Sequence, residues 1–192
     1  MRLAPNLPEK EKRVQFGATY FHNDIENLIT INNTGTSFEN VGRATTYGVE
    51  SFVAYTPWEP LSLRVDYTFL IAKDDITDTE LLRRPKHKAS LNAAWHVTEA
   101  AVLSATLVYV GPWFDVNRAG TMSGVPANGY TIVNLAGSYD LGGGLSAYAR
   151  IDNLFDRRYQ DPIGFLRPGF GIYAGMRMGI RCCRSNKLSM RA

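Results

Sequence analysis

The feature that most constrains this chain is a strict alternation of apolar and polar side chains, clearest in SLRVDYTFLI at residues 62–71. Successive side chains of an extended strand point to opposite faces. Leu63, Val65 and Tyr67 therefore share one face, and Arg64 and Asp66 share the other. A period of two excludes an amphipathic helix here. The segment is a strand whose two faces meet different surroundings.

The same alternation recurs along the chain and predicts an all-β fold. Apolar and polar positions alternate in eight segments, at residues 14–31, 41–56, 62–71, 88–97, 101–111, 129–140, 145–152 and 170–180. Short and long links alternate along the chain. The short, turn-rich links are at 56–60, 98–100 and 140–144, and the longer polar links are at 31–40, 72–85, 111–129 and 155–169. Short turns at one end and long loops at the other predict an antiparallel up-and-down meander.

The composition excludes some classes of protein. A helical membrane span needs about 18 consecutive apolar residues, and the most apolar stretch, at 100–111, is interrupted by Ser104 and Thr106. A transmembrane β-barrel stays possible, because only alternate residues of its strands must be apolar. The net charge of +3 is scattered rather than clustered, which gives no case for nucleic acid as a partner. Two adjacent cysteines, Cys182 and Cys183, form neither a metal motif nor a disulfide framework.

The charged residues of the strands are expected to face a water-filled interior. A Lys or Arg facing hydrocarbon would cost about 2–4 kcal/mol at the bilayer midplane. The predicted charged wall of the lumen consists of Glu50, Arg64, Asp66, Lys88, Arg150, Asp152 and Arg177. We expect Glu50 to approach Arg64 across one hairpin, and a structural role for these charges is favoured over a functional one.

Aromatic residues near the strand ends predict two rims at the membrane interfaces, where Trp and Tyr are enriched. The predicted aromatic girdle consists of Tyr55, Trp58, Trp95, Tyr109, Trp113, Tyr139 and Phe155. An alternative is that aromatic residues are simply common in strands. The girdle is favoured because it agrees with the alternation of short and long links.

No pattern points to catalysis. His22, His87 and His96 show no metal-ligand spacing, and no G-x-S-x-G motif is present. The acidic stretch DDITD at 74–78 could bind calcium, but it lacks the glycine and terminal glutamate of a helix-loop-helix calcium site. We favour a solvated loop tip there, and expect no enzyme activity, no resident metal and no cofactor.

Several motifs resemble one family. FHNDIENLI (21–29), ENVGRATTYGVES (39–51), ITDTELLRRPKHKASL (76–91), RIDNLFDRRYQ (150–160) and GFGIYAGMRM (169–178) are similar, in order and spacing, to the C-terminal barrel of TonB-dependent outer-membrane receptors. The pairing of TDTELLRRP with NLFDRRY is most similar to the cobalamin receptor branch, although siderophore receptors share much of it.

The resemblance implies a transmembrane β-barrel segment of about eight strands from a barrel of about 22 strands, in the Gram-negative outer membrane. It implies uptake of a large scarce nutrient such as cobalamin or an iron-siderophore, driven by TonB. The expected partners are membrane lipid, the nutrient, TonB, and a plug domain and N-terminal strands that this sequence does not match; nor does it match a TonB box.

The resemblance also suggests boundaries. Residues 13–180 are expected to be barrel, residues 1–12 a lead-in and residues 181–192 an atypical tail, RCCRSNKLSMRA, without a terminal aromatic residue. This tail and the missing signal peptide suggest a truncated or frameshifted gene product. Two alternatives stay open: a self-contained eight-stranded outer-membrane barrel with a structural or adhesive role, and a soluble lipocalin-like binder with its apolar face inside.

Overall fold

The computed structural model describes residues 13–27, 29–31, 36–40 and 42–179. Every regular element among them is a β-strand. None of these residues forms a helix of the length and apolarity that a membrane crossing requires. The lead-in at 1–12 and the tail at 181–192 that the sequence suggests lie outside the described residues.

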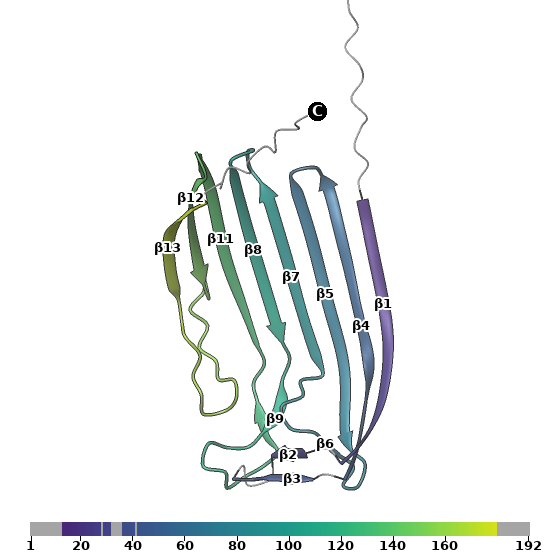
Figure 1. Ribbon diagram of the computed structural model, residues 1–192. Helices are drawn as coiled ribbons and strands as arrows, with labels where there is room; N and C mark the ends of the chain where they lie inside the picture. The colour runs from purple at the N-terminus through teal and green to yellow at the C-terminus, as the bar shows by residue number, and fades with distance from the viewer. Residues whose placement is uncertain (1–12, 28, 32–35, 41, 180–192) are drawn as a thin grey trace, which may run out of the picture.

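One large antiparallel sheet dominates the structure (Figure 1). Its eight long strands follow chain order and are β1 (Arg13–Glu26), β4 (Arg43–Trp58), β5 (Leu61–Asp74), β7 (His87–His96), β8 (Ala101–Val110), β11 (Tyr130–Gly142), β12 (Leu145–Asp152) and β13 (Gly171–Met178). The short β6 (Thr79–Glu80) pairs with the end of β5. The predicted all-β meander of eight strands is confirmed.

The first predicted strand is too long. It was expected to span residues 14–31, whereas β1 ends at Glu26 and a separate short strand, β2 (Ile29–Ile31), pairs with β3 (Phe38–Asn40). The break falls at Asn27, which adopts a left-handed backbone with φ 57°. Asn is one of the residues that tolerate this conformation, so an apolar-polar pattern that continues through Asn27 does not mean a continuous strand.

The links between the long strands separate into two groups, at opposite ends of the sheet (Figure 1). Tight turns join β4 to β5, β7 to β8 and β11 to β12. In the last of these, Gly142, Gly143 and Gly144 all have positive φ, between 63° and 84°, a conformation that glycine adopts at little cost. The longer loops gather at the other end with β2, β3 and β6, and with β9 (Trp113–Asp115) paired to β10 (Val125–Ala127).

The sheet is open, and among the described residues no second layer of strands or helices covers it. Its first and last strands, β1 and β13, lie at opposite edges (Figure 1). The closed eight-stranded barrel considered above would need these two strands side by side. The buried apolar residues of the described chain are few: Ala44, Ala72, Val110, Trp113, Val116 and Ala127. Large apolar side chains such as Phe16, Leu103 and Ile172 are exposed, unlike the enclosed apolar face of a lipocalin-like binder.

Gly48 marks a close approach between strands. A Cβ built on this residue would overlap the carbonyl oxygen of Phe69 and come within 2.9 Å of the Phe21 ring. We expect Gly48→Val to lower the free energy of unfolding by about 1–3 kcal/mol, the usual cost of overpacking. Urea unfolding in phospholipid vesicles measures this. The matched control is Ala54→Val, on the same face of β4 beside an open cavity. Equal stability of the two variants would contradict the expected clash.

Candidate functional site

The strand register places all seven of the predicted charged residues on one face of the sheet. Residues opposite each other on neighbouring strands share a face. Thr68 lies opposite both Glu50 and Lys88, and the pairs from Ser62 through Ala94, Ser104 and Ala136 reach Arg150 on β12. The whole predicted charged set lies on this one face, called the polar face below: Glu50, Arg64, Asp66, Lys88, Arg150, Asp152 and Arg177.

Two of these arginines pair along their own strands. Arg64 donates from Nε and Nη2 to the Asp66 carboxylate, with Nη2 2.6 Å from Oδ1. Arg150 Nη2 lies 3.5 Å from Asp152 Oδ2. Residues two apart on a strand point the same way, so this spacing allows an ion pair within the strand. Each guanidinium also stacks on an aromatic ring of the neighbouring strand, 4.5 Å from the Phe52 and Tyr173 centroids respectively.

The expected approach of Glu50 to Arg64 is wrong. Glu50 lies opposite Thr68, four residues beyond Arg64 along β5. At about 3.3 Å per residue this is a separation of about 13 Å along the strand. Flanking the same short turn does not bring two residues together, because only residues at equal distances from the turn become neighbours.

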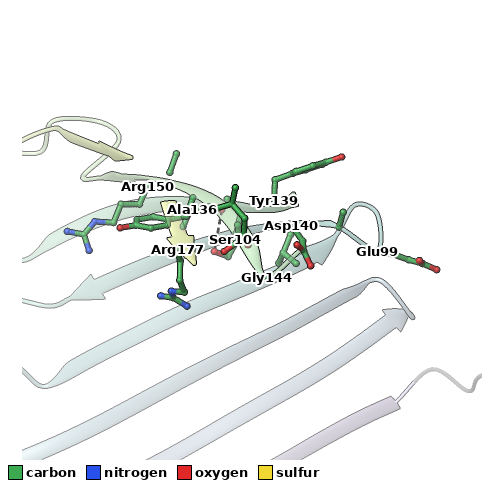
Figure 2. A pocket seen from close by; sticks show the side chains of 16 residues that line it. Glu99, Ser104, Ala136, Tyr139, Asp140, Gly144, Arg150 and Arg177 are labelled. Carbon is green, nitrogen blue, oxygen red and sulfur yellow. Dashed lines mark hydrogen bonds between the residues drawn. The ribbon is translucent and has the colours of Figure 1, made fainter. Parts of the chain in front are cut away.

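Three polar-face charges have no partner in the described part of the chain: Glu50, Lys88 and Arg177 form no hydrogen bond or ion pair there. Figure 2 shows Arg177 and Arg150 at one side of a cavity of 630 Å³ on this face, with Glu99 and Asp140 at the side nearer the turns. The polar face thus carries both fixed ion pairs and charges free to meet another group.

The opposite face, called the apolar face below, carries continuous apolar rows. One row crosses six strands and consists of Phe16, Val53, Val65, Leu91, Leu107 and Val133. No formal charge interrupts it. The alternation read from single segments therefore extends across the sheet.

The register places most of the predicted girdle on the apolar face. Tyr55, Trp95 and Tyr139 lie there near the short turns, and Tyr109 lies toward the long loops. A register shift after Tyr55 sets Trp58 opposite Leu61, which puts Trp58 on the same face. Contact of this face with lipid stays a prediction.

Trp113 does not belong to such a rim. Its side chain is 6% exposed and packs against Val108, Val110 and Tyr130. These three residues lie on the polar face, so the loop that carries Trp113 folds toward that side. Phe155, also predicted in the rim, lies in the turn after β12 and is 75% exposed. Aromatic residues in the loops do not follow the strand alternation.

A second aromatic group on the apolar face went unnoticed in the sequence. Tyr67 Oη lies 2.8 Å from His87 Nδ1, and the Phe69 and His87 rings are 5.3 Å apart. The alternation in residues 62–71 predicts Tyr67, and with it Phe69 two residues further on, on this face, but only as part of its apolar surface. Their pairing with His87 depends on the β5–β7 register, which a single segment does not reveal.

The long loops are held together by a buried carboxylate. Asp115, fully buried, accepts hydrogen bonds from Arg83 Nε at 2.7 Å, from Val116 N at 2.8 Å and from Ile163 N at 2.9 Å. Its partners thus come from the 75–86 loop, the 111–129 loop and the 153–170 loop. We call Asp115 and these partners the three-loop junction. Arg83 and Ile163 are far from Asp115 in sequence, so no local pattern announces the junction.

Asn153 holds the 153–170 loop at its base. Its side chain donates to the carbonyl oxygens of Arg157 at 2.9 Å and Pro168 at 3.2 Å, and accepts a hydrogen bond from Arg157 N at 2.8 Å. It is buried, with a left-handed backbone at φ 51°. One asparagine thus joins both ends of the loop.

A second cavity of 410 Å³ lies between the 111–129 and 153–170 loops. It is lined by residues 125–129, Arg157, Arg158, Tyr159, Gln160 and Ile163. Tyr130 fixes one wall, because its hydroxyl donates to Asp161 Oδ2 at 2.9 Å and its ring stacks on Tyr159 with centroids 4.1 Å apart. We call this the loop cavity.

The acidic loop and the histidines show local roles. Asp74 accepts hydrogen bonds from the amides of Ile76 and Thr77, and Lys73 Nζ lies 3.0 Å from Asp78. His22 bonds to Asp24. The described residues bring together no group of three or more metal-ligating side chains.

Comparison with known proteins supplies the family. The sequence model of the family described as "TonB dependent receptor-like, beta-barrel" matches residues 9–154, which is most of the chain.

Solved structures agree in fold. The ferric enterobactin receptor PfeA of Pseudomonas aeruginosa superposes with a TM-score of 0.68 at 23% identity, covering 84% of this chain and 28% of its own. The copper transporter OprC superposes with a TM-score of 0.70 at 18% identity, covering 85% of this chain and 27% of its own. The ferric-catecholate import receptor Fiu of E. coli superposes with a TM-score of 0.66 at 21% identity, covering 86% of this chain and 25% of its own. This chain spans less than a third of each. From the family match, this chain belongs to the TonB-dependent receptor β-barrel family.

Proposed function

We propose that the chain forms the last eight strands of the barrel of an outer-membrane TonB-dependent receptor that takes up a large scarce nutrient. The observation that carries this proposal is the separation of side chains by the register. Seven charged residues share the polar face, and an apolar row crosses six strands on the other. The polar face then lines the lumen and the apolar face contacts lipid.

The energetics of the two faces support this orientation. Moving exposed apolar side chains from water into contact with acyl chains is favourable. Each Å² of apolar surface removed from water contributes about 25 cal/mol of stabilisation. The charges of the polar face need water or a polar partner, because a charge in hydrocarbon is costly. The aromatic residues Tyr55, Trp58, Trp95 and Tyr139 then form the rim at the short turns, which face the periplasm in such barrels.

The cargo class follows from two lines of support that differ in detail. The sequence motifs favour cobalamin, whereas the similar structures are named as receptors for ferric enterobactin or catecholate, and as a copper transporter. The loop cavity, with Arg157, Arg158 and Tyr159, suits an anionic aromatic cargo such as a ferric catecholate. We therefore place an iron-siderophore beside cobalamin as the candidate cargo.

The remaining partners follow from the same proposal. The edges of β1 and β13 would pair with the N-terminal strands of the receptor, since backbone groups in a bilayer must be hydrogen-bonded. A plug domain would occupy the lumen beside the polar face, and TonB would supply the energy for uptake. Residues 13–180 would form the barrel part. The role is transport, without covalent chemistry.

Opposite responses to the same charge test the orientation. Leu91→Arg places a cation in the apolar row, and Asn92→Arg places it on the polar face one residue along. We expect Leu91→Arg to lower the free energy of unfolding in phospholipid vesicles by about 2–4 kcal/mol, and Asn92→Arg to change it by less than about 1 kcal/mol. Urea titration of the receptor in vesicles gives both values. Equal costs, or a larger cost for Asn92→Arg, would refute the orientation.

Removing the cations of the loop cavity tests the cargo. In cells expressing the receptor, we expect the Arg157→Ala, Arg158→Ala double variant to bind radiolabelled ferric enterobactin about tenfold more weakly, a loss of about 1.4 kcal/mol. Cobalamin binding, measured in parallel, should not depend on these cations. Arg167→Ala is the matched control, since Arg167 is in the same loop and outside the cavity lining. Unchanged ferric enterobactin binding would remove the iron-siderophore from the candidates.

A further inference from the structure

Asp115 stands out because it is an ionisable side chain with 0% exposure in a structure that buries very little. Carboxylates are almost never fully buried unless they are paired. Both oxygens of Asp115 are occupied, Oδ1 by Arg83 and the Val116 amide and Oδ2 by the Ile163 amide. The side chain is therefore fully satisfied, and each of its long-range partners belongs to a different loop.

The contact with Arg83 is made twice. Besides the ion pair at 2.7 Å, the Arg83 backbone amide donates to the carbonyl oxygen of Phe114 at 2.7 Å. The backbone of Arg83 is left-handed, with φ 60°. The 75–86 loop is thus attached to β9 by main chain and side chain together. In the described part of the chain, Arg83 donates to residues 114 and 115 and accepts from Arg84, and none of its hydrogen bonds there reaches the 153–170 loop.

The contact with Ile163 lies at the inner wall of the loop cavity. Ile163 is a cavity residue, and Asp161, two residues earlier, accepts the Tyr130 hydroxyl. On the other side Arg118 Nη1 donates to the Gly164 carbonyl oxygen at 3.3 Å. The segment that carries Arg158 and Tyr159 in the cavity lining therefore lies close in sequence to Ile163, whose backbone amide donates to Asp115.

The charge of Asp115 connects its contact with Arg83 to its contact with the Ile163 amide. A buried carboxylate that loses its cation is an uncompensated charge, which is strongly destabilising. Asp115 without Arg83 would be drawn toward water, away from the Ile163 amide. We propose that Asp115 is a positioning residue that joins the three outer loops into one unit, so that Arg83 of the 75–86 loop controls the placement of the cavity wall in the 153–170 loop.

This inference rests on the proposed function only where it treats the loop cavity as a cargo site. The coupling between the loops can be measured without cargo. Limited trypsin digestion of the receptor in outer-membrane vesicles reports it, with cleavage after Arg158 followed by mass spectrometry. We expect R83Q and D115N each to speed cleavage after Arg158 by about tenfold, because proteolysis follows the population of the opened loop. The double variant should exceed D115N by less than about twofold, since both changes break one network.

The matched control is D156N. Asp156 is in the same loop, and among the described residues its side chain accepts one hydrogen bond, from the Phe170 amide. The rate of cleavage after Arg158 in D156N should therefore stay within about twofold of the wild type. A response in R83Q confined to the 75–86 loop, with Arg158 still protected, would overturn the coupling. Faster cleavage after Arg158 in R83Q and D115N with unchanged binding of ferric enterobactin would instead keep the coupling and count against the proposed function of the loop cavity alone.

Unfolding is separated from coupling by cleavage inside the sheet. Arg64 and Lys88, in β5 and β7, should stay uncut in a folded variant. If R83Q or D115N exposes them, R83K decides the question, because lysine keeps the cation while losing the geometry of the guanidinium. Protection of Arg158 in R83K would support the coupling, and cleavage after Arg158 in R83K as fast as in R83Q would overturn it.

Discussion

Backbone hydrogen bonding between neighbouring strands is the interaction on which the rest of the structure depends. The pairing runs without interruption from β1 to β13, and it fixes which side chains share a face. Because the register keeps the same parity from strand to strand, the seven predicted charges on β4, β5, β7, β12 and β13 reach one side, while Arg43 and Lys73, near the loop end, lie on the other. A slip of one residue in any pair would move a charge into the apolar rows.

This arrangement dispenses with an ordinary core. The described chain buries only a handful of apolar side chains, and most of them lie in or beside the loops rather than over the sheet. In a soluble domain such a sheet would be unstable, since burial of apolar surface is the main driving force of folding. In the account proposed here, lipid takes the place of the missing layer on one face, and water with enclosed charges takes the other.

The loops follow different rules. Beyond the strand ends alternation no longer decides where side chains point, and specific polar contacts take over. Asp115 and Asn153 are the buried polar residues of the described chain, and each holds backbone that would otherwise be free. The end of the sheet with the long loops therefore carries the three-loop junction and, beside it, a cavity lined by the cations Arg157 and Arg158.

Sequence reasoning succeeded where structure is periodic and failed where it is not. The alternation in residues 62–71 sufficed to place Arg64 and Asp66 on one face, and the turn residues gave the order of the strands. It could not give the register, so the Glu50–Arg64 approach was wrong and the Tyr67–His87 contact was missed. Trp113 was misplaced because an aromatic residue near a strand end looks alike whether it faces outward or folds over the loops. Asp115 joins distant segments and leaves no local signal.

The account's central claim concerns the medium on each face of the sheet, and nitroxide labels test it most directly. Labels would be placed singly at Val65 and Asp66 of the receptor in phospholipid vesicles, with Cys182 and Cys183 replaced by serine. The account predicts that the label at Val65 collides mainly with oxygen, which concentrates in lipid. The label at Asp66 should collide mainly with a water-soluble nickel complex. Greater access of the nickel complex to the label at Val65 than to the one at Asp66 would contradict the account.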